Sequence, residues 1–217
     1  MNELKKDWHL ILLILVPIVY LMYMYDTLPD TVPIHWNIKG QVDGYGSKGM
    51  LWIPAWIPLV SYLLFSFIPK MQSSQALKQM GKKYHKIKWV MVSFLTLTML
   101  YLFYLIGHDK TFSTDLMFAT MGVFFLLMGN YFKTIRINYL IGIRTPWTLK
   151  NESVWKKTHV LAGQVWFAGG LIIVMHSLFG VEAWRPYVFF FIIIMMLFIP
   201  MVYSYVIFHQ LENSEDL

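Results

Sequence analysis

The amino-acid sequence predicts an all-α integral membrane protein with six transmembrane helices and both termini in the cytoplasm. Hydrophobic residues make up 57% of the 217 residues and charged residues only 14%, whereas a soluble domain carries about 25% charged residues. Six apolar segments each approach the roughly 20 residues that a helix needs to cross a bilayer. Lysine and arginine concentrate in alternate connections between these segments, which is typical of a multi-pass membrane protein.

The N-terminal part of the chain predicts a two-helix module, residues 1–68. Its first span covers residues 8–25, where tyrosines at the far end suit the membrane interface. Residues 26–50 follow as a loop rich in proline and glycine, and such a segment cannot span lipid. The second span covers residues 51–68. The module therefore presents one ordered loop on the outer side of the membrane.

The remaining chain, residues 69–217, predicts a four-helix region. A lysine-rich connection leads to the third span, and a tight polar turn separates the third span from the fourth. The loop 133–159 precedes the fifth span, and a short turn joins the fifth span to the sixth. The four spans cover residues 89–106, 116–132, 160–179 and 187–208.

The distribution of positive charge predicts the orientation of these spans. Fourteen lysines and arginines lie on the side of the N-terminus and four on the opposite side. Because cytoplasmic connections carry the excess of these residues, we expect the loop 133–159 in the cytoplasm and the loop 26–50 outside. The net charge of +6 therefore indicates the lipid bilayer as a partner and not direct binding of nucleic acid.

Several kinds of chemistry are not expected. The absence of cysteine from the sequence excludes disulfides, thiolate metal sites and cysteine nucleophiles. Lysine, arginine and carboxylates are missing near the middle of every span, which argues against an ion pump or a proton-coupled transporter. A single histidine in the outward loop is thin evidence for a metal site, which needs three or four convergent ligands. Since no hydrolase, metalloprotease or phosphate-binding motif occurs either, we predict no cofactor, no metal and no enzymatic activity.

The outward loop holds candidate ligand-binding residues. Proline and glycine restrict its backbone, while Trp36 and Tyr45 offer large contact areas at little entropic cost. These features favour a rigid surface that recognises an extracellular ligand, although an ordered cap that only packs fits the same residues. The candidate residues are His35, Trp36, Asn37, Asp43, Tyr45 and Lys48.

The cytoplasmic segment 138–159, NYLIGIRTPWTLKNESVWKKTH, contains more chemistry than a connection between helices needs. Pro146 moves Thr145 out of the helical region, and Thr148 or Asn151 can then cap a helix. In that helix Trp155 and His159 lie four residues apart and so share a face. The alternative is that the basic residues only set the topology and the tryptophans only lie at the interface.

Two stretches of the sequence carry a resemblance to a known family. GIRTPWTLKNESVWKKTH, after the fourth span, resembles the signature of the SdpI family of bacterial membrane proteins. LPDTVPIHWNIKGQVDGYGSK is similar to the extracellular module common at the front of these proteins. The positions that carry the family motif are Asn138, Gly142, Arg144, Thr145, Pro146, Trp147, Thr148, Trp155 and His159.

The resemblance implies a function in the bacterial cell membrane. Its best-known member confers immunity to a secreted antimicrobial peptide toxin and holds a DNA-binding autorepressor at the membrane. By this resemblance, the outward loop would meet the toxin, and the segment 138–159 would form the family core or face the repressor. A transporter or exporter of a small amphipathic molecule is the alternative. A membrane enzyme that uses the cytoplasmic loop ranks below both.

Overall fold

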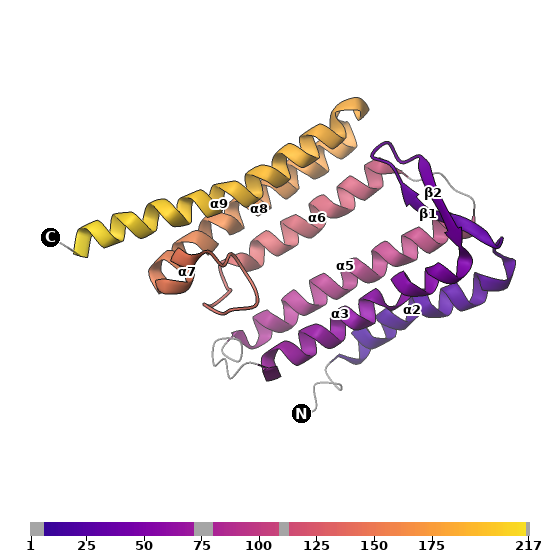
Figure 1. Ribbon diagram of the computed structural model, residues 1–217, viewed down its shortest axis with the longest axis horizontal. Helices are drawn as coiled ribbons and strands as arrows, with labels where there is room; N and C mark the ends of the chain where they lie inside the picture. The colour runs from indigo at the N-terminus through magenta and orange to yellow at the C-terminus, as the bar shows by residue number, and fades with distance from the viewer. Residues whose placement is uncertain (1–6, 72–79, 109–112, 216–217) are drawn as a thin grey trace. The chain divides into compact units, whose positions relative to one another are not determined.

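The computed structural model describes residues 7–71, 80–108 and 113–215 (Figure 1). These residues contain six helices that are long and apolar enough to cross a membrane, which confirms the predicted all-α membrane fold. The helices are α2 (Trp8–Met24), α3 (Trp52–Met71), α5 (Lys82–Gly107), α6 (Thr114–Phe132), α8 (Glu152–Phe179) and α9 (Arg185–Glu215). The orientation of the termini stays a prediction.

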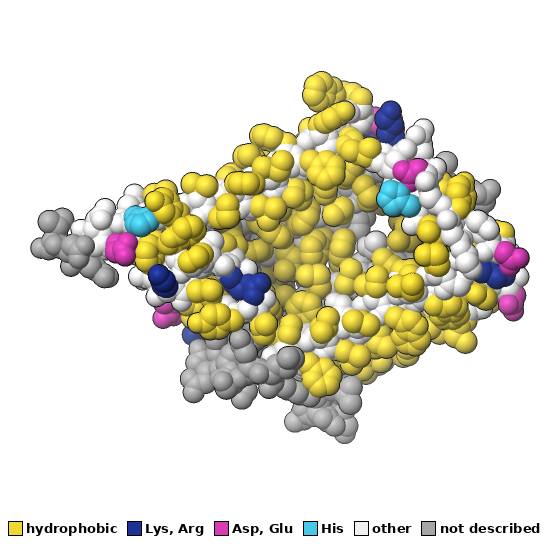
Figure 2. Space-filling view, in the orientation of Figure 1, with side chains coloured by type: hydrophobic (Ala, Val, Ile, Leu, Met, Phe, Trp, Pro, Cys, Tyr) yellow, Lys and Arg dark blue, Asp and Glu magenta, His cyan; other side chains and the backbone are white. Residues whose placement is uncertain are grey.

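Several helices extend beyond their apolar segments. Helix α5 begins at Lys82, before the predicted span at residue 89, and α8 begins at Glu152, before residue 160. Lysine and glutamate are good helix formers, so a helix can continue into the polar region beyond the lipid. Figure 2 shows hydrophobic side chains covering the helices. Exposure of this much apolar surface would be a liability in water and is the normal state of a lipid-facing helix.

The chain packs as two compact units. The first comprises residues 1–67 and 88–114, and the second comprises residues 68–87 and 115–217. The first unit therefore contains α2 and most of α3 and α5. The division predicted from the sequence, between residues 68 and 69, remains a prediction about domains and differs from this packing by the place of α5.

The first unit is held together by two clusters of buried side chains. Apolar residues recur on α2 at helical spacing and meet α3 and α5 on one face. Because lipid is as apolar as leucine, this contact is stabilised by close packing rather than by removal of water. One cluster comprises Ile18, Leu21, Met24, Leu28, Val32, Leu51, Ala55 and Phe103, and the other comprises Leu10, Ile14, Tyr62 and Val92.

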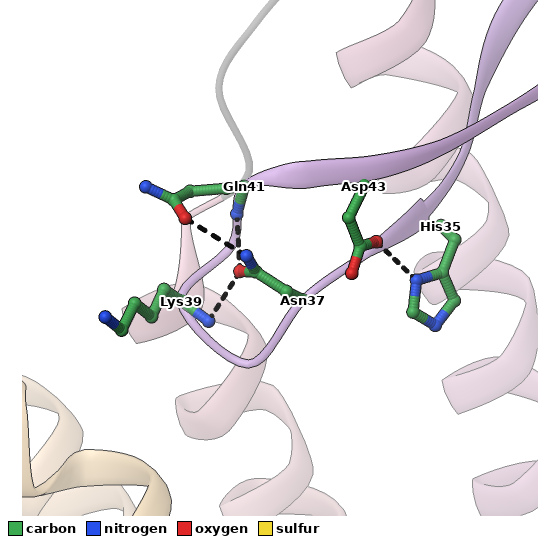
Figure 3. Close-up of polar contacts among 5 residues, drawn as sticks. All are labelled: His35, Asn37, Lys39, Gln41 and Asp43. Atoms are coloured by element: carbon green, nitrogen blue, oxygen red, sulfur yellow. Dashed lines mark hydrogen bonds and ion pairs between the residues drawn. The ribbon is translucent and has the colours of Figure 1, made fainter.

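A β-hairpin forms between α2 and α3, in the stretch predicted only as an ordered loop. Strand β1 (Thr31–Trp36) pairs antiparallel with β2 (Val42–Ser47). Asn37 builds the turn, because its side-chain oxygen accepts hydrogen bonds from the backbone N–H groups of Lys39 at 2.9 Å and Gln41 at 3.1 Å (Figure 3). Gly40 completes the turn with a φ of 76°, a conformation that favours glycine.

In the second unit, glycines let α6 and α8 approach backbone to backbone. A Cβ atom on Gly129 would lie 2.6 Å from the backbone nitrogen of Phe167, and one on Gly170 would lie 2.6 Å from the carbonyl oxygen of Gly122. Such contacts leave no room for a side chain. Small residues at helix interfaces are the usual means of close packing in membranes. A cluster of buried apolar residues on α6, α8 and α9 extends this contact: Phe118, Phe125, Ile173, Phe189, Ile192 and Met196.

Candidate functional site

The hairpin and the end of α5 enclose a groove of about 910 Å³ in the first unit. Trp36 and Tyr45 line it from the strands, and residues 105–108 line it from α5. Grooves of this size accommodate organic ligands or peptide side chains. The lining residues include Lys39 and His108 and, among those described, no aspartate or glutamate. The groove therefore combines apolar walls with groups that favour a neutral or anionic occupant.

The other four candidate residues of the outward loop do not line this groove. The Nδ1 atom of His35 lies 2.5 Å from Oδ1 of Asp43, and both side chains are largely exposed (Figure 3). The Asn37 side chain is hydrogen-bonded within the turn, where its Nδ2 also donates to Oε1 of Gln41 at 3.0 Å. The structure thus brings two of the six candidates, Trp36 and Tyr45, together at one concave surface.

Lys48 fastens the base of the hairpin. Its Nζ atom donates to the carbonyl of Leu28 at 3.3 Å and lies 3.4 Å from Oδ1 of Asp30. The same ammonium lies 5.3 Å from the centre of the Tyr25 ring, within range of a cation–π interaction. Lys48 therefore holds the start of the loop, the end of the hairpin and the end of α2 together.

The segment 138–159, in contrast, uses most of its polar side chains internally. The Asn138 side chain is buried, and its oxygen accepts hydrogen bonds from the N–H groups of Leu140 and Ile141 at 2.8 and 2.7 Å. Its nitrogen donates to the carbonyls of Arg136 and Ile141. One side chain thereby satisfies four backbone groups in a stretch with no regular structure, as buried backbone requires.

Residues 145–150 form a capped helical turn, α7 (Pro146–Lys150). The Thr145 hydroxyl accepts from the N–H of Thr148 at 3.2 Å, and the Thr148 hydroxyl accepts from the N–H of Thr145 at 3.0 Å. This reciprocal arrangement is a capping box. The Thr145 hydroxyl also lies 3.1 Å from that of Ser204 on α9, and Trp147 contacts the ring of Tyr205 edge-on. The turn is therefore docked on α9.

Asn151, one of the two residues predicted as the N-cap of this helix, caps α8. Its side-chain oxygen accepts from the N–H groups of Ser153 at 2.8 Å and Val154 at 3.1 Å. Thr148 instead belongs to the preceding turn. The sequence analysis missed that turn because five helical residues leave no periodic pattern to detect.

Trp155 and His159, on the first turns of α8, form the buried core of the segment 138–159. Both are buried and stacked, with ring centres 4.1 Å apart. The indole N–H of Trp155 donates to the carbonyl of Ile135 at 2.8 Å. Nε2 of His159 accepts from the N–H of Ile143 at 3.0 Å, while Nδ1 lies 2.8 Å from the carbonyl of Trp155. An accepting Nε2 requires the neutral ring with its proton on Nδ1.

Gly142 lies directly against this core. Its φ is +108°, and a Cβ atom at this position would overlap the imidazole of His159. Only glycine tolerates both conditions. Arg144 is exposed and donates to the carbonyl of Tyr139, and Pro146 is also exposed. Of the nine motif positions, these two face outward, and the remainder are buried or partly buried.

The structure also contains a buried polar cluster that the sequence analysis did not anticipate. Nζ of Lys88 lies 2.5 Å from Oδ2 of Asp7, and the hydroxyl of Tyr62 donates to the same oxygen at 3.2 Å. The three residues join the start of α2 to the middle of α3 and to the second turn of α5. Sequence reasoning missed the pair because 81 positions separate its members. No group of three or more metal-ligating side chains occurs among the described residues.

Comparison with known proteins gives four findings. Residues 134–204 match the model of the SdpI/YfhL protein family, and residues 12–57 match a domain of unknown function (DUF1648). The chain is 27% identical over 214 residues to the "Immunity protein SdpI" of Bacillus subtilis (strain 168), which covers 97% of this chain and 100% of that protein. No solved structure matches the chain. The first match spans α7, α8 and the buried core around His159, and the second spans α2 and the hairpin.

Proposed function

We propose that the chain is a member of the SdpI family of multi-pass bacterial membrane proteins and that it protects its host against a secreted antimicrobial peptide. The likeness to an immunity protein along nearly the whole chain supports this function. The observation that carries the proposal furthest is the groove beneath the hairpin. It offers a concave apolar surface with two aromatic side chains at the predicted outer face.

The proposed site of recognition is the wall formed by Trp36 and Tyr45. Tyr45 is 64% exposed and Trp36 is partly exposed, and both line the same groove. Aromatic side chains in a pocket are the usual anchors of protein–peptide contacts. The hairpin is braced by its Asn37 turn and by Lys48, so binding would cost little ordering of the loop. Residues His35, Asn37, Asp43 and Lys48 then support the hairpin's shape or contact the peptide outside the groove.

A second function is proposed for the cytoplasmic side, where the chain would hold a DNA-binding repressor at the membrane. Arg144 and Pro146 favour it, since they are the exposed members of a motif that is otherwise folded inward. The buried members, Trp155 and His159 among them, would then act by holding this surface in shape. Such signalling requires peptide binding outside to change the population of two conformations that the repressor distinguishes.

Survival of a sensitive bacterium that expresses the protein tests the immunity function. The cells are challenged with a panel of membrane-active peptides, and membrane levels of the protein are matched by immunoblot. We expect protection against one peptide class, and we expect Trp36→Ala to abolish that protection. Trp184→Ala is the control, because Trp184 is similarly large and 62% exposed but lies in the other packing unit.

The outcomes separate the competing functions. Full protection by Trp36→Ala would remove the groove from the mechanism. Failure of the unaltered protein to protect against any peptide would favour the alternative, transport or export of a small amphipathic molecule. Movement of such a molecule across liposomes containing the purified protein would then be the decisive measurement.

A further inference from the structure

A second groove, of about 480 Å³, lies in the other packing unit between α8 and α9. Its polar lining includes Lys156, Lys157 and Gln164 from α8 and Tyr203 from α9. Val160 and Leu161 supply apolar surface between them. Neither the proposed peptide site nor the buried core around His159 uses these side chains.

The groove is positively charged and its polar groups are available. The lining contains two lysines and no aspartate or glutamate. Within the described part of the chain, the side chains of Lys156, Lys157, Gln164 and Tyr203 take part in none of the hydrogen bonds or ion pairs. In the predicted topology this end of α8 faces the cytoplasm, where the leaflet carries anionic lipid.

Gln164 is the informative residue, because an exposed amide is costly on a lipid-facing helix. It lies seven and eight residues beyond the two lysines, which is about 10–12 Å along a helix that rises 1.5 Å per residue. The polar interfacial layer on each side of a bilayer is about 5–8 Å thick. Gln164 thus lies at the start of the hydrocarbon, where water is scarce and an unsatisfied amide is unfavourable.

An apolar strip continues from Gln164 along the same face of α8. Val160, Phe167 and Leu171 are four residues before, three after and seven after it, and their exposed fractions are 40%, 46% and 45%. Residues at these spacings share one helix face. Along α8 the two lysines come first, then the amide of Gln164, and then the apolar strip. This order matches the phosphate, the glycerol esters and the acyl chain of a phospholipid.

We propose that this groove binds one anionic phospholipid of the inner leaflet. Lys156 and Lys157 bind its phosphate headgroup, the amide of Gln164 donates to an ester carbonyl, and one acyl chain lies along Val160 and Phe167. The hydroxyl of Tyr203 lines the opposite wall. A bound lipid of this kind would fix the depth of α8 and α9, and with it the height of the capped turn α7.

Native mass spectrometry of the purified full-length protein tests the proposal, with phosphatidylglycerol and phosphatidylcholine as probes. We expect the protein to retain phosphatidylglycerol in preference to phosphatidylcholine. Each basic residue near the surface strengthens binding of anionic lipid several-fold, so Lys156→Gln with Lys157→Gln should weaken retention of phosphatidylglycerol about tenfold or more. Gln164→Leu keeps the charge and should weaken retention of both lipids.

The matched control is Lys133→Gln with Lys150→Gln, which removes the same charge from two exposed lysines outside the groove. It should change retention less than about twofold. Equal losses in the two double variants would overturn the proposal, because the attraction would then be diffuse. Equal retention of the two lipids by the unaltered protein would also overturn it, and unchanged retention in Gln164→Leu would overturn the ester contact.

Discussion

The hairpin and the segment 138–159 are both rich in polar and aromatic residues, yet they use them in opposite ways. In the segment 138–159, Asn138, Thr148 and His159 are buried and bonded to backbone groups of the same segment. In the hairpin, Trp36 and Tyr45 face a groove instead. The long motif thus stabilises a local fold, whereas the short turn-rich stretch leaves two aromatic side chains at the groove where we propose that the peptide binds.

This comparison predicts different consequences of mutation in the two regions. Substitutions of the buried residues of the segment 138–159 should lower the free energy of unfolding and reduce protection only through the amount of folded protein. Substitutions of the aromatic side chains at the groove, Trp36 and Tyr45, should leave the free energy of unfolding nearly unchanged and abolish protection. Four variants test the contrast, in order of decreasing effect on stability.

Gly142→Ala should be the most damaging of these substitutions. The added Cβ would both occupy a left-handed conformation and overlap the ring of His159. Strain of the first kind costs about 1–3 kcal/mol and overpacking of a core costs a similar amount, so we expect a loss of about 3 kcal/mol or more. Thermal unfolding of the purified protein in detergent measures this loss.

Gly40→Ala is the matched control in the hairpin, because Gly40 also has a positive φ, 76°. Gly40→Ala should lower the free energy of unfolding by about 1 kcal/mol, because only the positive φ disfavours the alanine. Equal losses in the two variants would contradict the view that the segment around Gly142 is a packed core.

Thr148→Val should have the next largest effect on stability. The change keeps the shape of the side chain and removes the hydroxyl that accepts from Thr145 N–H and donates to the carbonyl of Ile143 at 2.8 Å. Loss of a cap costs about 1 kcal/mol and an unsatisfied buried carbonyl costs a further 1–3 kcal/mol. Chemical denaturation measures the difference. Thr148→Ser retains the hydroxyl and should recover most of the loss; if it does not, packing of the methyl group is the more important term.

The elements that the sequence predicts well are those with a long local signal. Each of the six spans is an apolar run, and Asn151 was one of two expected caps for α8. The sequence of the hairpin does not predict strands, because Gly44 and Gly46 are poor strand residues. Their extended conformation is stabilised by pairing with β1. Local sequence patterns do not predict contacts between distant segments. Two such contacts are the wall of the groove at His108 and the ion pair between Asp7 and Lys88.

Tyr45→Ala should leave stability almost unchanged and still remove function. The side chain is 64% exposed, so its truncation loses few contacts within the protein, and changes at such surface positions are usually within about 0.5 kcal/mol. Removal of an aromatic anchor from an interface commonly costs 2 kcal/mol or more of binding. We therefore expect normal thermal unfolding and a loss of protection in the survival assay. Tyr139→Ala, equally exposed at 65% but in the segment 138–159, should retain protection.

Asp43→Asn should have the smallest effect and decides which face of the hairpin binds. The strand register shifts on both sides of His35, so no residue of β1 lies opposite Asp43. Oδ1 of Asp43 lies 2.5 Å from Nδ1 of His35. Both side chains are largely exposed, and exposed ion pairs contribute about 0–1 kcal/mol. Neither residue lines the groove. If the groove is the binding surface, Asp43→Asn should unfold normally and still protect, as should Asp30→Asn at the base of the hairpin. Loss of protection in Asp43→Asn alone would place the peptide on the opposite face, against His35, and would make the groove part of the scaffold.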